Sequence, residues 1–208
     1  MSFCPPANLV NAILAPTATD AAPDLIARAQ QGDASSFTRL CREHEDRLFR
    51  QASFLCGNPS LAEDLVQETL IEAWKSLHRF DRRCQFFTWL CSILLHRYKN
   101  ILRQRRPLPF ADFNSPERAR AETTLLDQPD DAARPDQAAA AAERARELKR
   151  CLDKLAPKHR DVIYLRYYCG DSLEGISAAL DCSVGTVKSR LFHALEKLRR
   201  MNAAITQL

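Results

Sequence analysis

The chain of 208 residues has no apolar run long enough to span a bilayer, and we expect no membrane insertion. Residues 1–22 contain neither Lys nor Arg, which argues against a secretory signal. We therefore expect a cytoplasmic protein that begins with a disordered tail over 1–22. No stretch keeps the apolar–polar alternation of a strand, and no internal repeat is present. These absences predict an all-α protein.

Paired metal-ligand motifs are also missing, although eight cysteines are present. None of them forms a Cys-x-x-Cys pair, and the Cys41–His44 spacing has no second half. Cysteines in a reducing compartment pack as small apolar side chains. Nor does any nucleophile stand in a pattern with a base. We therefore expect no metal, no cofactor and no enzymatic activity.

Charge is distributed unevenly along the chain, although its net value is only +4. Residues 1–106 and 144–208 are net basic, whereas 107–143 are net acidic and rich in Pro, Asp and Ala. Each basic block favours a polyanionic partner. The composition predicts two small helical domains over 23–106 and 143–208, joined by a flexible acidic linker over 107–142.

The segment from Gly170 to Arg200 predicts two short helices separated by a tight turn. Ser172 is placed to cap the first helix, the break falls at Asp181 and Cys182, and Ser183 is placed to cap the second. Apolar residues recur on one face of the second helix: Val184, Val187, Leu191, Ala194, Leu195 and Leu198. This layout is typical of a helix-turn-helix whose second helix enters the DNA major groove. A helical hairpin with a solvated basic face is the alternative.

Helix signals upstream predict four more helices in the first domain. We expect them over 24–30, from a cap at Ser35 or Ser36 through Leu55, from a capping box at Ser60–Glu63 to about Leu77, and over 86–105. In the second half, a helix over 138–155 is predicted to end at Pro157, and another follows over 161–168.

One of these helices carries an acidic stripe. Its predicted buried face comprises Leu61, Leu65, Leu70, Ala73, Trp74 and Leu77. Asp64, Glu68 and Glu72 are spaced at i, i+4 and i+8, where like charges repel. The helix dipole explains acids in the first turn but not Glu68 and Glu72. We interpret the stripe as a docking surface for a basic protein partner.

The next helix and the loop before it are strongly basic. The bases are Arg79, Arg82, Arg83, Arg97, Lys99, Arg103, Arg105 and Arg106, with Phe80, Phe86, Phe87, Trp89 and Tyr98 interleaved. Basic side chains bind phosphates, and aromatic rings stack on nucleobases. Together they favour binding of melted DNA. Trp89 is better explained by core packing, and the loop over 80–85 is the better place for base contacts.

These residues together resemble the sigma-70 family of bacterial transcription initiation factors, in its extracytoplasmic-function (ECF) group. Three blocks in order carry the resemblance. They are residues 63–74 (EDLVQETLIEAW), residues 86–90 (FFTWL), and residues 155–160 (LAPKHR) with 182–190 (CSVGTVKSR).

The resemblance implies core RNA polymerase, promoter DNA as duplex and as melted non-template strand, and an anti-sigma factor as partners. With the stripe, it places polymerase binding at Asp64, Gln67, Glu68 and Glu72. Minus-ten contacts are expected from Phe80, Arg82, Arg83, His96, Arg97, Lys99, Asn100 and Arg103. Minus-thirty-five contacts are expected from Thr186, Lys188, Ser189, Arg190, Phe192 and His193.

Three positions depart from the family's usual residues. His96 stands where Asn is frequent, Gly175 where Glu is usual and His193 where Arg is frequent. They bear on which promoter is read. Two other hypotheses remain open at this point: a stand-alone helix-turn-helix regulator, and an adaptor that binds proteins only.

Overall fold

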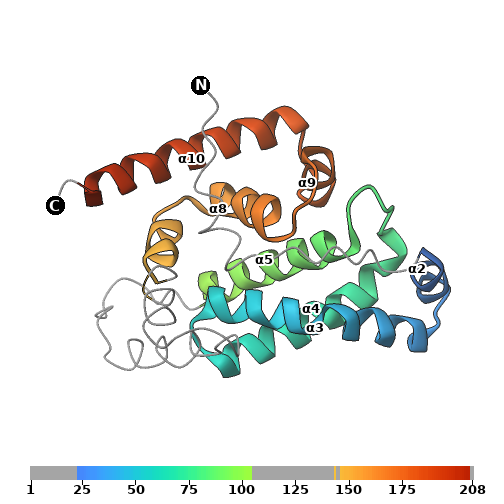
Figure 1. Cartoon of the computed structure of the whole chain (residues 1–208). Coiled ribbons are helices and arrows are strands. Elements are labelled where there is room, and N and C mark those ends of the chain that lie inside the picture. Colours follow the sequence, from blue (N-terminus) through green and yellow to red (C-terminus); the bar gives the residue numbers. More distant parts are fainter. Residues whose placement is uncertain (1–22, 105–142, 144–145, 207–208) are drawn as a thin grey trace, which may run out of the picture. The chain divides into compact units, whose positions relative to one another are not determined.

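The computed structural model of the chain describes residues 23–104, 143 and 146–206, and every element in these ranges is a helix (Figure 1). The chain divides into two compact units. In the described ranges, the N-terminal unit comprises 23–82 and 89–104, and the C-terminal unit comprises 83–88, 143 and 146–206. The all-α prediction is confirmed. The predicted tail and linker lie outside the described residues.

Helices α2 (Pro23–Gln30) and α3 (Ala34–Cys56) meet at a turn fixed by Asp33. Its carboxylate accepts hydrogen bonds from the amides of Ser35 and Ser36 at 3.0 and 3.3 Å, and from both hydroxyls. The hydroxyls of Ser35 and Ser36 are the largest causes that lower the pKa of Asp33 well below its usual range. The predicted cap at Ser35 or Ser36 is therefore wrong, because Asp33 caps α3 and the serines donate to it.

Helix α3 ends at Gly57, and α4 (Pro59–Ser76) begins two residues later. Gly57 has a left-handed φ of 63° and donates to the Ser53 carbonyl, a conformation that glycine adopts without strain. Asn58 then caps α4 by accepting from the Leu61 amide at 3.0 Å, and Pro59 fills the first helical position. The predicted capping box at Ser60 and Glu63 is therefore wrong.

The core of the N-terminal unit lies where α3 packs against α4. Its fully buried side chains include Leu40, Leu48 and Leu65. A single turn, η1 (Leu77–Arg79), follows α4, and the Gln30 side chain holds it by donating to the carbonyls of Leu77 and Phe80.

Helix α5 (Phe86–Gln104) matches the predicted helix over 86–105 to within one residue. Within the N-terminal unit, the buried Tyr98 hydroxyl donates to the Leu55 carbonyl at 2.8 Å. This bond ties the middle of α5 to the end of α3 and fixes which side of α5 faces the core.

The C-terminal unit contains a helical stretch over 146–153, then α8 (Pro157–Ile163) and a π-helical turn, η2 (Tyr164–Tyr168). Pro157 begins α8 as its first residue, so the helix predicted over 161–168 starts earlier than expected. Helix α9 (Leu173–Ala179) and α10 (Val184–Thr206) follow, and α10 packs on α8 and α9. Fully buried Val162, Ile176 and Val187 join the three helices.

The helix-turn-helix forms as the sequence predicts. Ser172 accepts from the Gly175 amide at 2.9 Å and caps α9. Asp181 takes a positive φ of 47° in the turn, and the Ser183 hydroxyl accepts from the Thr186 amide at 3.1 Å to open α10. Short polar side chains tolerate this left-handed conformation, which explains the break at Asp181.

Candidate nucleic-acid and protein interfaces

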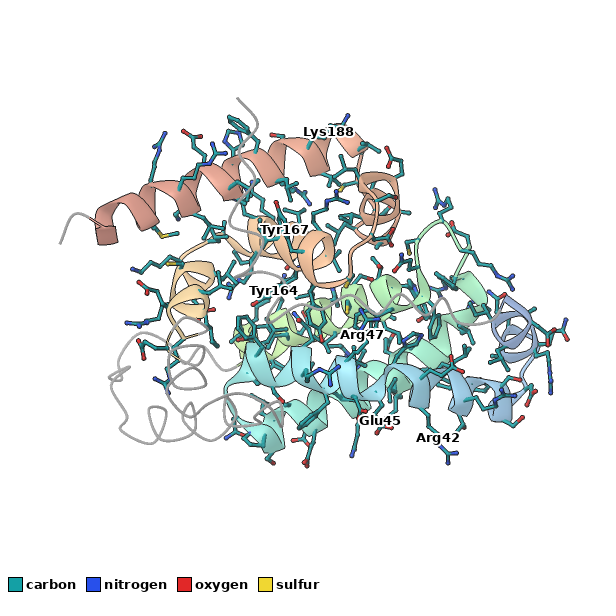
Figure 2. The ribbon with its side chains drawn as sticks, in the orientation of Figure 1. Arg42, Glu45, Arg47, Tyr164, Tyr167 and Lys188 are labelled. Atoms are coloured by element: carbon teal, nitrogen blue, oxygen red, sulfur yellow. The ribbon has the colours of Figure 1, made fainter. Side chains whose placement is uncertain are left out.

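The exposed side of α10 carries most of the predicted minus-thirty-five residues. Lys188, Ser189, Phe192 and His193 are exposed, and Phe192 presents 64% of its surface. Buried Val187 and Ala194 hold the opposite side against the domain. Lys188 lies toward the N-terminal end of α10 (Figure 2), which is the end that enters a major groove in helix-turn-helix proteins.

Thr186 and Arg190 are half-buried at the edge of this surface. The Thr186 hydroxyl is 2.9 Å from that of Ser183, so it already takes part in the helix cap. The Arg190 guanidinium lies 3.9 Å from the Cys182 sulfur across the turn. Both side chains therefore support the turn in this structure, whereas the four exposed residues are directly available to a ligand.

His159 of α8 joins this surface, and sequence reasoning did not select it. Its ring is roughly parallel to that of His193, with centroids 6.3 Å apart. Burial is the largest cause that lowers the pKa of His159, followed by the positive charges of Lys158, His193, Arg190 and Lys197. The neighbouring lysines and arginine make this surface basic, and α8 contributes Lys158 to it. The place of His159 on this surface follows from the packing of α8 against α10, two helices that are separated in the sequence.

The outward side of α4 combines acids with apolar side chains. Asp64, Gln67 and Glu68 are exposed as expected. Ile71 and Trp74, which follow them on the same side, are 53% and 39% exposed. The prediction that Trp74 is buried is wrong. The buried face of α4 is instead centred on Ala62, Leu65, Val66, Thr69 and Ala73, and Trp74 lies at its border with its ring 5.0 Å from that of Phe37.

Two acids of the stripe, Glu68 and Glu72, have a nearby cation within the N-terminal unit. Arg97 of α5 approaches Glu72 at 3.5 Å and Glu68 at 3.9 Å. These acids in mid-helix, which the helix dipole does not explain, thus lie near a cation of α5. Arg97 was predicted as a minus-ten contact, and the structure places it beside the acidic stripe.

Other predicted minus-ten residues are distributed over α5 and the preceding loop. His96 and Arg103 are exposed, and Lys99 and Asn100 are half-buried on the same helix. Arg82 and Arg83 are exposed in the loop, and Arg82 has a positive φ of 62°. Its guanidinium lies 3.4 Å from the Gln30 side chain.

Phe80 corrects the expectation for this loop, because its ring is buried and lies 5.0 Å from that of Trp89. The ring supports the core, as predicted for Trp89. Base stacking by Phe80 would require it to leave that position.

Seven described cysteines are free, and burial, with a smaller effect of Glu45, raises the pKa of Cys41 to about 12. The described residues hold no group of three or more His, Cys, Asp or Glu side chains arranged for a metal ion. None of the described helices has the length and apolar character required to cross a membrane.

Comparisons with known proteins agree with the order of these surfaces. Residues 40–107 match the Sigma-70 region 2 family, and residues 151–200 match Sigma-70, region 4. The ECF RNA polymerase sigma factor SigW of Bacillus subtilis (strain 168) is 30% identical over 177 residues, which cover 84% of this chain and 93% of SigW. The chain belongs to the ECF group of the sigma-70 family.

Further similarities place this ECF sigma factor in the same group. The ECF RNA polymerase sigma-E factor of Escherichia coli (strain K12) is 31% identical over 176 residues, covering 84% of this chain and 90% of that protein. The solved structure of CnrH in complex with the cytosolic domain of CnrY aligns with a TM-score of 0.61 at 28% identity, over 89% of this chain and 99% of CnrH.

A second solved structure supports the fold alone. It is the sigma factor RpoE with the anti-sigma factor NepR from Bartonella quintana, which has a TM-score of 0.52 at 23% identity and covers 79% of this chain and 97% of that one. The region 2 match contains α4 and α5, and the region 4 match contains the helix-turn-helix. As a sigma factor, the chain works with core RNA polymerase and promoter DNA.

Proposed function

We propose that the two units divide the recognition of one promoter. The C-terminal unit, within the predicted domain 143–208, inserts the start of α10 into the major groove of the minus-thirty-five element. Lys188, Ser189, Phe192 and His193 are exposed there and contact the duplex, while Thr186 and Arg190, which lie on the same helix, contact it from the half-buried edge of this surface. Cations around His159 strengthen phosphate binding at the same surface.

The predicted domain over 23–106 holds the melted minus-ten strand along α5 and the preceding loop. His96, Lys99, Asn100 and Arg103 supply hydrogen bonds and charge from α5, and Arg82 and Arg83 supply charge from the loop. Because Phe80 is buried, binding of the melted strand rests on these polar and basic groups rather than on stacking by Phe80.

Helix α4 docks on core polymerase through a mixed surface. Asp64, Gln67 and Glu68 supply charge and hydrogen bonds, and Ile71 and Trp74 supply apolar area beside them. This exposed pairing of acids with large apolar side chains is the single observation that best supports docking. Exposed Ile and Trp side chains lose water contact only when a partner covers them, and the acids select a basic partner.

The proposal extends to the compartment, the chemistry and a regulator. The chain acts in the cytoplasm with polymerase and carries out no catalytic step of its own. It is held inactive by an anti-sigma factor that covers polymerase and DNA surfaces. CnrH, solved in complex with the cytosolic domain of CnrY, supports the expectation of such a protein partner.

DNA binding with and without core polymerase tests this proposal against its two rivals. We expect the chain alone to bind a native promoter fragment weakly, and the chain with core polymerase to bind it specifically, with affinity falling steeply as salt rises. Tight specific binding by the chain alone would favour a stand-alone regulator. An adaptor would show no salt-dependent binding alone and would add no promoter-specific binding to that of core polymerase.

A further inference from the structure

Arg97 lies between two surfaces to which the proposed function gives different partners. It follows His96 directly on α5 and precedes Asn100 and Arg103 by three and six residues, so it borders the proposed minus-ten surface. Its guanidinium reaches across to α4 and approaches the carboxylates of Glu68 and Glu72, at 3.9 and 3.5 Å. One cation is thus shared by the edge of the DNA surface and the acidic stripe.

The contacts that Arg97 makes are loose. Neither N–O distance is that of a short charge-assisted hydrogen bond, which lies near 2.8 Å. The Arg97 Nε is buried and donates no hydrogen bond to any described residue. Glu68 and Glu72 retain 51% and 42% side-chain exposure, so both carboxylates stay accessible to another cation. A half-exposed pair with this geometry contributes little stability and is readily exchanged.

We propose that Arg97 is an exchangeable counter-ion that links polymerase docking to DNA capture, an inference that rests on the proposed function. In the free chain, Arg97 neutralises part of the charge of Glu68 and Glu72. When α4 docks, a basic side chain of polymerase takes over these carboxylates. Arg97 is released and turns to a phosphate of the minus-ten strand, next to His96 and Asn100.

The exchange gives docking and DNA binding a mutual dependence. Polymerase competes with Arg97 for the carboxylates, so Arg97 weakens docking in the absence of DNA. DNA phosphate draws Arg97 away from Glu68 and Glu72, which leaves them more negative and strengthens docking. Coupling of this kind is reciprocal by linkage, since each ligand changes the affinity for the other by the same factor. The DNA surface therefore gains a cation only in the assembled complex.

The substitution Arg97→Gln tests the proposal with two readouts of opposite sign. The variant removes the charge and keeps a polar side chain. We expect full-length R97Q to bind core polymerase about two- to five-fold more tightly at low salt. The saturated complex should bind a promoter fragment more weakly, with its logarithmic salt slope reduced in magnitude by about one, as expected for one lost phosphate contact.

A matched control removes a positive charge elsewhere in the same unit. Arg42 is exposed on α3, and its side chain extends away from the helix ribbons in Figure 2. Arg42→Gln should change neither affinity. A Glu68→Gln/Glu72→Gln background gives a second control. These substitutions should weaken core binding, and adding Arg97→Gln there should produce no further tightening.

Three results would overturn the exchange. They are weaker or unchanged core binding by R97Q, tighter core binding with unchanged promoter binding, and tightening that persists in the Glu68→Gln/Glu72→Gln background. Failure of the proposed function is distinguishable from these, because the wild-type chain would then show no core-dependent promoter binding. Far-ultraviolet circular dichroism of each variant separates loss of folding from loss of binding.

Discussion

Asp171 and Gly175 share a small volume at the start of the helix-turn-helix. The Asp171 carboxylate is buried and accepts from the Ser172 amide at 2.7 Å. A Cβ at position 175 would lie 2.2 Å from Asp171 Oδ1, well inside van der Waals contact. Glycine within a helix normally costs about 1 kcal/mol against alanine. Here it is required, because the space for a side chain is already occupied by a fixed carboxylate.

Substitution Gly175→Ala should therefore destabilise the protein despite its better helix propensity. We expect a loss of about 1–3 kcal/mol, as for overpacked sites. Thermal unfolding followed by circular dichroism measures it. Asp171→Ala in the same chain should restore part of the loss by vacating the space. A single Gly175→Ala variant that is more stable than the wild type would contradict this account.

His159 gives the C-terminal unit a pH dependence whose sign follows from its pKa. Burial and neighbouring cations lower the folded pKa of His159 below its usual value, so the unfolded chain binds the proton more tightly. The contribution of His159 to the stability of the folded unit is therefore fully present above its unfolded pKa. It is lost as the pH falls through its folded pKa.

Denaturant unfolding at about pH 7.5 and 5.5 measures this effect. His159→Gln should reduce the loss of stability on acidification, because the group that takes up a proton on unfolding is gone. An equal loss in the wild type and the variant would show that His159 does not contribute.

The start of helix α4 is determined by Asn58, the capping residue just before it. Asn58 accepts from the Leu61 amide, while the Ser60 hydroxyl caps no amide among the described residues. We expect Asn58→Ala to cost about 1 kcal/mol of unfolding free energy and Ser60→Ala to be nearly neutral. Denaturant titration of the two variants compares them directly. The reverse order would restore Ser60 as the cap.

The apolar part of the α4 surface is expected to act in binding rather than in folding. Ile71 is half-exposed, so Ile71→Ser should change stability by less than about 0.5 kcal/mol. Binding to core polymerase should weaken about five-fold through lost apolar burial. Ile71→Val keeps most of that area and serves as control. Unchanged affinity of Ile71→Ser, measured by titration against labelled core enzyme, would exclude this part of the docking surface.

Local signals predicted the elements well and their contacts less well. Periodicity located α5 and the helix-turn-helix, and Ser172 and Ser183 are the caps expected, because those signals lie within a few residues. Asp33, Asn58 and the serines that follow them are all residue types that cap helices, and the pattern does not reveal at which of them the helix begins. The Arg97 pair with Glu68 and Glu72 depends on the packing of α4 beside α5, which no local spacing encodes.

At the scale of the whole molecule, charge is divided by task. Acids gather on α4, whereas exposed cations and polar groups mark α5 and α10. The two proposed DNA surfaces can each bind weakly, since joining them in one chain raises the effective concentration of the second after the first has bound. We therefore expect selective promoter binding to depend on polymerase and both units together.

Run-off transcription with purified core polymerase tests the central claim most directly. With the wild-type chain we predict a promoter-specific transcript that is absent with core polymerase alone. A chain carrying Asp64→Lys and Glu68→Lys should give none, because reversed charge on α4 prevents docking while the exposed positions leave the fold intact. No specific transcript from native promoters with the wild-type chain, or full activity of the charge-reversed variant, would contradict the account.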